Sequence, residues 1–223
     1  MTFKKSLNVK TSEAMITQYA IGALSPAKHV ILTCQRDISE AVAERLAFQE
    51  DVAAAMLADV NSVALSPLFI GNVLAALPDQ NDVELDNKED SIAGLAPKSL
   101  RSLLKQAFKD IKWKTIVPGV AVHDIIGGRK TKNGDRLYLM KVKGGMKMPE
   151  HGHVGEEWTL ILSGSYVAGG QTFSRGDLHI EEGNETHSPH VDEGEDCVCL
   201  VMTENALKMN GWLPKLIQPL IGI

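Results

Sequence analysis

Cysteine, aromatic residues and long apolar runs are scarce in this sequence, and two of these shortages exclude a class of protein. Only 3 of the 223 residues are cysteine, an odd number and too few for a disulfide framework. A disulfide-stapled secreted domain is therefore excluded, and the count agrees with a reducing compartment. No apolar run reaches the length of about 18 residues that a membrane-spanning helix needs. We therefore predict a cytoplasmic protein without a membrane segment.

Charge of one sign is not in large excess either. The chain carries 23 basic and 28 acidic residues, for a formal net charge of −5 that both halves share. A nucleic-acid-binding surface concentrates lysine and arginine, so we expect no direct contact with nucleic acid. With 44% hydrophobic residues, the composition is that of a folded globular protein.

The first half of the chain has the periodicity of amphipathic helices, with apolar residues every three or four positions. Ser12 and Ser25 each precede such a pattern as N-cap residues, and Pro26 takes the first helical position of the second pattern. This second pattern runs without an interior glycine or proline to Val60. It predicts one long helix or two helices in tandem.

Two more helices are predicted further along, on either side of an acidic segment. The first lies between Pro67 and Pro78, and the second starts at Pro97 with an apolar stripe. Between them, the segment DQNDVELDNKED is acidic and poor in large apolar residues. Such a segment is typical of a solvated linker.

After about Trp113 the periodicity changes from that of helices to the two-residue alternation of strands. The segments VAVHDII, RLYLMKVKG, WTLILSGSYVAG, QTFSRGDLHIE and DCVCLVMTE are short and are separated by turn residues. They predict an antiparallel sandwich or small barrel. We therefore predict an α+β chain in three parts: a helical domain at 1–65, an acidic linker and helix at 66–112, and an all-β domain at 113–223.

Two histidines and a glutamate lie close together in the sequence at the start of one predicted strand, in the stretch HGHVGEEWTLILSG at 151–164. His151, His153 and Glu157 are separated by even steps, so in a strand their side chains share one face. His187, after a later strand and turn, offers a fourth ligand. Imidazole nitrogen and one carboxylate suit a divalent transition metal. We therefore predict a metal site built from these four residues.

The same region resembles the two sequence motifs of the cupin family. The matching positions of the first motif are Gly145, His151, His153, Glu157 and Gly164. In the second motif Gly176 and His187 match, whereas Glu182 and Asn184 stand where the family commonly has proline and glycine. The resemblance implies an antiparallel jelly-roll barrel, so that 113–223 is predicted to be a cupin metal-binding domain.

We expect structural roles for two further histidines and two cysteines of this half. We expect His179 and His190 to be residues of the rim or the surface. Cys197 and Cys199 share one face of a predicted strand and are expected to pack in the barrel wall. A redox-sensitive cysteine pair close to the metal is the alternative.

Several stretches together resemble the ChrR-type anti-sigma factors. They are MPEHGHVGEEWTLILSGSY, RGDLHIEEGNETHSPHV, DCVCLVMTE and LPKLIQPLIGI, together with YAIGALS near the start. The resemblance implies that the helical domain holds an extracytoplasmic-function sigma factor away from RNA polymerase. It also implies that the metal cupin senses a stress such as singlet oxygen or an oxidised organic compound. A conformational change or metal loss at the cupin would then be transmitted through residues 66–112 and release the sigma factor.

The helical domain departs from the family in its metal ligands. The family binds zinc there through a histidine and an H-x3-C-x2-C motif, whose aligned positions in this chain are Gln35, Ser39 and Val42. His29 and Cys34 are five residues apart, about 140° round a helix, and so do not share a face. We therefore expect no zinc in this domain, and we expect apolar packing alone to hold it together.

Other functions stay open alongside the regulator. The same four ligands with an open coordination position would serve a mononuclear metal-dependent cupin enzyme of the dioxygenase type, acting on a small organic molecule. A module that binds a sugar or another small molecule without turnover is a third alternative. We favour the regulator over the enzyme, and zinc over iron, nickel or manganese. A homodimer is a further alternative that the sequence leaves open.

Overall fold

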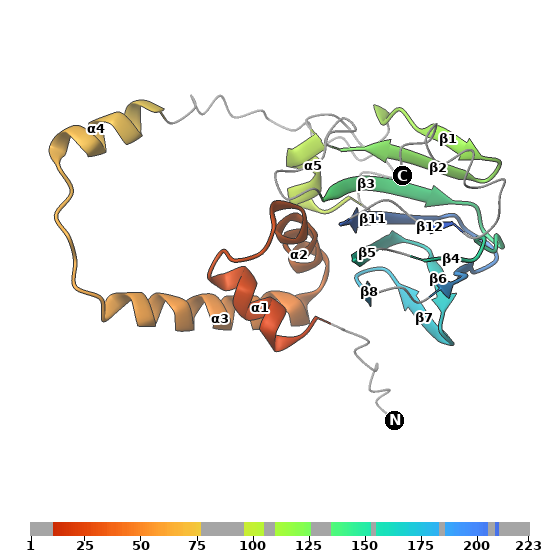
Figure 1. The fold of residues 1–223 in the computed structure, drawn as a ribbon, viewed down its shortest axis with the longest axis horizontal. Coiled ribbons are helices and arrows are strands. Elements are labelled where there is room, and N and C mark those ends of the chain that lie inside the picture. The colour runs from red at the N-terminus through yellow and green to blue at the C-terminus, as the bar shows by residue number, and fades with distance from the viewer. Residues whose placement is uncertain are drawn as a thin grey trace.

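The computed structural model describes residues 11–76, 96–104, 110–125, 135–152, 155–182, 186–204 and 208–209. Within these ranges helices come first and strands follow, as predicted for an α+β chain (Figure 1). The helices are α1 (Glu13–Ala20), α2 (Pro26–Ile38), α3 (Glu40–Ala58), α4 (Pro67–Ala76) and α5 (Lys98–Leu104). The strands are β1 (Lys114–Val117), β2 (Val120–Asp124), β3 (Arg136–Val142), β4 (His151–Gly152), β5 (Glu156–Ser163), β6 (Ser165–Ala168), β7 (Gln171–Ser174), β8 (Leu178–Glu182), β9 (Thr186–His187), β10 (His190–Val191), β11 (Cys197–Thr203) and β12 (Lys208–Met209).

The helices begin where the sequence predicted. The side chain of Ser12 accepts a hydrogen bond from the backbone nitrogen of Met15, 3.3 Å away, and Ser25 caps α2 in the same way. The long helical pattern is two helices, because the backbone of Ser39 is extended, with φ −113° and ψ 108°. Among the described helices, none is both long and apolar enough to span a bilayer.

The strands form antiparallel sheets. One sheet has six strands in the order β1-β2-β3-β11-β5-β8, and two smaller sheets have the orders β10-β6-β7 and β12-β4-β9. The strands β2, β3, β5, β6, β7, β8 and β11 lie in the predicted segments. The strand β1 was not predicted, and the two-residue strands β4, β9, β10 and β12 are too short to carry a pattern. In the described ranges the sheets stay separate and do not close into one continuous barrel.

A buried apolar cluster fills the space between the six-stranded sheet and the sheet β10-β6-β7. Its members are Val120, Val122, Tyr138, Val142, Ile161, Tyr166, Ala168, Phe173, Val191, Cys197, Cys199 and Val201. We call this side of the six-stranded sheet its inner face. The expected packing role of the two cysteines is confirmed, since Cys197 and Cys199 are 1% and 2% exposed and belong to this cluster.

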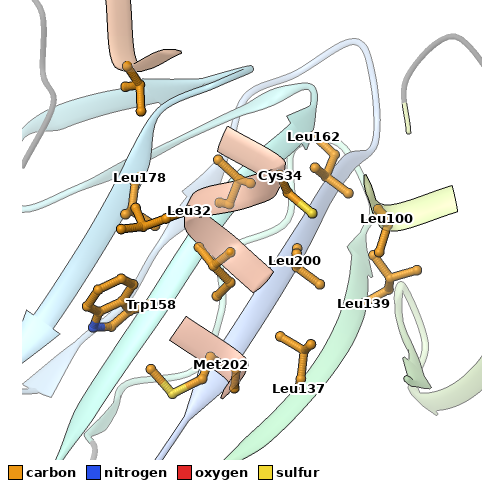
Figure 2. Close-up of a cluster of buried hydrophobic side chains, with 14 of the residues drawn as sticks. Leu32, Cys34, Leu100, Leu137, Leu139, Trp158, Leu162, Leu178, Leu200 and Met202 are labelled. Atoms are coloured by element: carbon orange, nitrogen blue, oxygen red, sulfur yellow. The ribbon is translucent and has the colours of Figure 1, made fainter. Parts of the chain in front are cut away.

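A second apolar cluster covers the other side of the six-stranded sheet, which we call its outer face. There α2 and α5 lie across the strands (Figure 2). The labelled members are Leu32 and Cys34 from α2, Leu100 from α5, Leu137 and Leu139 from β3, Trp158 and Leu162 from β5, Leu178 from β8, and Leu200 and Met202 from β11. The helices and the sheet therefore share one hydrophobic core. The domain boundaries at 65 and 112 stay predictions.

Polar contacts tie α2 to the same strands. The ammonium group of Lys28 lies 2.8 Å from a carboxylate oxygen of Glu156 and 2.8 Å from one of Glu204, and it sits 5.4 Å from the centre of the Trp158 ring. At the start of α2, the Ser25 hydroxyl donates to Asp135. The expectation that apolar packing alone holds the helical part is therefore wrong, because α2 is also held by charged and hydrogen-bonded contacts.

Gln35, which stands where the family has a zinc-binding histidine, is fully buried and makes two hydrogen bonds. Its amide oxygen accepts from the Thr11 hydroxyl at 3.1 Å, and its amide nitrogen donates to the carbonyl of Gly176 at 3.1 Å. Gly176 has φ +89°, and an added Cβ would lie 3.2 Å from Ile38, so glycine is needed there. A buried amide needs hydrogen-bond partners. The hydrogen bonds of Gln35 meet this need and join α2 to the turn before β8.

His29 and Cys34 lie on different faces of α2, as predicted. His29 is exposed and stacks on Tyr19, with ring centres 4.4 Å apart. Cys34 is buried, and burial together with the nearby Asp37 raises the pKa of its thiol to about 12. Cys34 thus packs as an apolar group in the cluster between α2 and the sheet.

Candidate metal centre

The strands β4 and β9 bring His151 and His187 together. The two residues are directly opposite each other in the antiparallel pair, so their side chains are on the same face. The Nε2 atoms of the two imidazoles are 2.9 Å apart, and the rings meet edge to face at 76°. His151 is 7% exposed, and the His187 side chain is 13% exposed. The structure thus places two of the four predicted ligands side by side.

Each of the two imidazoles is held at its other nitrogen. Nδ1 of His151 lies 2.7 Å from the carbonyl oxygen of Pro149, and a carbonyl only accepts, so this nitrogen carries the proton. Nδ1 of His187 faces the carboxylate of Glu181. With a proton on each Nδ1, both Nε2 atoms would present lone pairs to the same point. Two nitrogens bound to one ion at about 2.0–2.1 Å lie about 2.8–3.4 Å apart for bond angles between about 90° and 109°, a range that includes the observed separation.

Burial keeps His151 in the form that binds a cation. The pKa of His151 is lowered from its ordinary value, chiefly because burial disfavours the charged imidazolium, and the hydrogen bond to Pro149 opposes this only in part. At neutral pH the ring is therefore uncharged. A neutral imidazole with a free Nε2 lone pair is the form that coordinates a metal.

Glu157 lies on the inner face of β5. Burial raises the pKa of its carboxyl to about 7, and the Thr159 hydroxyl, which donates to it at 3.3 Å, opposes this rise. A buried carboxyl that is costly to ionise becomes far easier to ionise beside a bound cation. The chemistry of Glu157 therefore fits a ligand, although it does not join His151 and His187 in a closed cluster.

The complete four-residue ligand set stays a prediction. His153 lies outside the described residues. Among the residues that the structure does describe, no three histidine, cysteine, aspartate or glutamate side chains gather closely enough to hold an ion. The structure thus brings together two of the predicted ligands, His151 and His187, and places Glu157 on the inner face of the neighbouring sheet.

Two residues at this site were not predicted from the sequence. Glu181 and His179 are on β8, where they alternate with Leu178 and Ile180, which belong to the outer cluster. The expectation that His179 lies at the rim or surface is wrong, because its side chain is 11% exposed and stacks on Phe173 with ring centres 4.1 Å apart. The alternation of these two residues with Leu178 and Ile180 along β8 was the sequence signal that could have predicted their placement on the inner face. His190, in contrast, is exposed, as expected.

The cysteine pair lies on the same inner face. The sulfurs of Cys197 and Cys199 are 3.5 Å apart. The hydrogen bond from Cys197 and burial raise the pKa of the Cys199 thiol well above its ordinary value. The side chain of Cys199 is therefore a thiol at neutral pH, and a thiol is a weak nucleophile.

Comparison with known proteins covers both the helices and the sheets. A family model described as "ChrR Cupin-like domain" matches residues 103–207. The anti-sigma-E factor ChrR of Cereibacter sphaeroides (strain ATCC 17023) is 30% identical over 213 residues, which are 95% of this chain and 97% of that protein. This chain belongs to the ChrR family. A crystal structure of Rhodobacter sphaeroides SigE in complex with the anti-sigma ChrR matches it with a TM-score of 0.69 and 28% identity, over 86% of this chain and 96% of the matched chain.

Proposed function

We propose that this ChrR-family chain is an anti-sigma factor. Its helical part would bind an extracytoplasmic-function sigma factor, and its cupin part would hold a divalent metal and respond to oxidative or organic stress. Similarity to ChrR along 95% of the chain and to the SigE-bound form of ChrR supports the first role. Such a regulator acts where RNA polymerase is, which agrees with the predicted cytoplasmic location.

The observation that carries the proposal is an apolar surface on α3, α4 and the segment that joins them. We call it the α3–α4 apolar surface. Its large apolar residues are between 40% and 84% exposed: Phe48, Val52, Met56, Leu57, Val60, Val63, Leu65, Leu68, Phe69, Ile70, Val73 and Leu74. Figure 1 shows α4 standing clear of the other helices and the sheets. So many large apolar side chains exposed on neighbouring elements are typical of a binding site for another protein.

The chemistry of α4 indicates what kind of partner fits. Its ten residues, PLFIGNVLAA, include no charged side chain, and all of them are exposed. A helix that is almost wholly apolar and that no other described residue covers fits a groove or a pair of surfaces that encloses it. A sigma factor that wraps α4 would provide that enclosure.

The metal would be held by His151, His153, Glu157 and His187, and zinc is the ion we favour. When bound, the ion would cross-link β4, β5 and β9 by joining ligands from separate strands. The next residue to Glu157, Glu156, binds Lys28 of α2 on the outer face. The strand that supplies one ligand thus also anchors the helical part. This gives metal loss a route to the helices through α2, in addition to the predicted route through residues 66–112.

The ligand assignment is tested by two single substitutions and a control. His151→Ala or His187→Ala is expected to lower the metal content of the purified protein to below about half that of the wild type, because each removes one imidazole of a shared site. His190→Ala, at an exposed histidine on β10, should leave the content unchanged. Elemental analysis measures all three. Wild-type metal content in both His151→Ala and His187→Ala would overturn the assignment.

The anti-sigma role is tested with purified components. The full chain is mixed with extracytoplasmic-function sigma factors of its source organism, and we expect a stable complex with one of them in size-exclusion chromatography. The same chain should inhibit transcription directed by that sigma factor in vitro. Absence of a complex together with unaffected transcription by all of them would overturn the proposal. Oxygen consumption with an organic substrate would then favour the enzyme.

A further inference from the structure

Behind His187 a chain of polar contacts continues along the inner face. Nδ1 of His187 faces one carboxylate oxygen of Glu181, and the other oxygen lies 3.3 Å from Nε2 of His179. On its far side, Nδ1 of His179 is 2.8 Å from the hydroxyl of Tyr166. The carboxylate of Glu181 is therefore held between two imidazoles. The side chains of Glu181 and His179 are 20% and 11% exposed.

The fold keeps these groups in place. On β8 the residues that alternate with His179 and Glu181 pack on the outer face, so a slip of one position would bury the charged groups against α2. The His179 ring is fixed by stacking on Phe173, which is 1% exposed. Glu181 is also directly opposite Glu157 in the register of β5 and β8. Glu181 is therefore anchored beside two of the predicted ligands by a packed strand.

We propose that Glu181 is the positioning residue for His187. Its carboxylate accepts the Nδ1 proton, which leaves the lone pair on Nε2, and it fixes the direction in which the ring presents that lone pair. His179 and Tyr166 hold Glu181 in turn. A carboxylate in this place makes an imidazole ligand more basic and more rigid. The inference rests on the proposed metal site.

The geometry separates this role from that of a ligand. The two nitrogens of an imidazole lie on opposite edges of the ring, and Nε2 of His187 faces His151. A carboxylate against Nδ1 is therefore on the side of the ring away from an ion on Nε2. Glu181 acts on the ion through His187.

The experiment measures metal affinity in the full chain. Dissociation constants for Zn²⁺ are obtained by competition with a chromophoric chelator, and the visible spectrum of the Co²⁺ form reports the ligand set. Glu181→Ala is expected to weaken Zn²⁺ binding by about 10–100-fold. Glu181→Gln keeps an acceptor for the Nδ1 proton and should recover part of this loss. The matched control is Glu182→Ala, one residue further on β8 and exposed, which should bind as the wild type does.

The Co²⁺ spectrum of Glu181→Gln should match that of the wild type, because the ligands are unchanged. A changed band pattern would mean that Glu181 is itself a ligand, and this would overturn the positioning role. Wild-type affinity in Glu181→Ala, in a protein whose affinity His187→Ala abolishes, would overturn this inference and leave the proposed site standing. Failure of the wild type to bind either ion would overturn the proposed site itself. If Glu181→Ala does not fold, Glu181→Gln decides by the same measurements, with a measurable loss of affinity expected.

Discussion

Replacing Trp158 with alanine is expected to lower the free energy of unfolding by about 3–5 kcal/mol and to destabilise the helices together with the sheet. Trp158 is 1% exposed on the outer face of β5. Its Nε1 donates to the carboxylate of Glu156 at 2.7 Å, and that carboxylate also binds Lys28 of α2. The substitution thus leaves a cavity beneath α2 and releases one of its anchors. Since a domain of this kind is stable by only about 5–15 kcal/mol, the loss is a large share of the total.

The measurement is denaturant unfolding, followed by far-ultraviolet circular dichroism for the helices and by the remaining tryptophan fluorescence for the sheet. In the wild type the two signals should change in one transition, and in Trp158→Ala both should move to lower denaturant. Trp113→Ala is the control, because Trp113 is only half-buried and should cost less. A helix transition that stays at its wild-type midpoint in Trp158→Ala would contradict the shared core.

Charged residues on α4 are expected to abolish binding of the sigma factor without weakening the fold. Phe69 and Val73 are one helical turn apart on α4 and are 53% and 46% exposed. In a protein interface a few apolar anchors contribute most of the binding free energy, at about 2 kcal/mol or more each. The double variant Phe69→Asp, Val73→Asp should therefore bind its sigma factor at least about 100-fold more weakly. The midpoint of unfolding should not change, because neither side chain is buried.

Binding is measured by titration of the purified sigma factor, and unfolding by denaturant. Val117→Asp is the matched control, since Val117 is an apolar residue of the sheet with similar exposure, 37%. It should bind as the wild type does. Wild-type affinity in the double variant would show that the α3–α4 apolar surface does not contact the sigma factor near α4.

The elements that were predicted correctly depend on neighbours in the sequence. Ser25 caps α2 through a backbone nitrogen three residues away, and the apolar run of β11 is contained in seven residues. Such signals are complete within one turn or one strand, so no knowledge of the remaining chain is needed to interpret them. The two-residue strands β4 and β9 were missed because pairing, and not their own pattern, defines them.

At the candidate site, the spacing of the motifs predicted that His151 and His187 would meet, and they do. The contact of Glu181 with His187 and the inward direction of His179 were not predicted. Both depend on which face of β8 is covered by the helices. With α2 on the outer face, Leu178 and Ile180 turn toward it, and the polar residues between them turn inward.

By itself the sequence determined the helical and β halves, their caps and turns, the resemblance to the ChrR family and the residue types of a metal site. Only the tertiary structure decided that α2 lies on the six-stranded sheet, that Gln35 and Lys28 bind residues more than a hundred positions away, and that none of the other described residues covers α4. Local periodicity tells which residues of an element share a face. What covers that face depends on the register and packing of segments far apart in the chain, and their contacts form only when the whole chain folds.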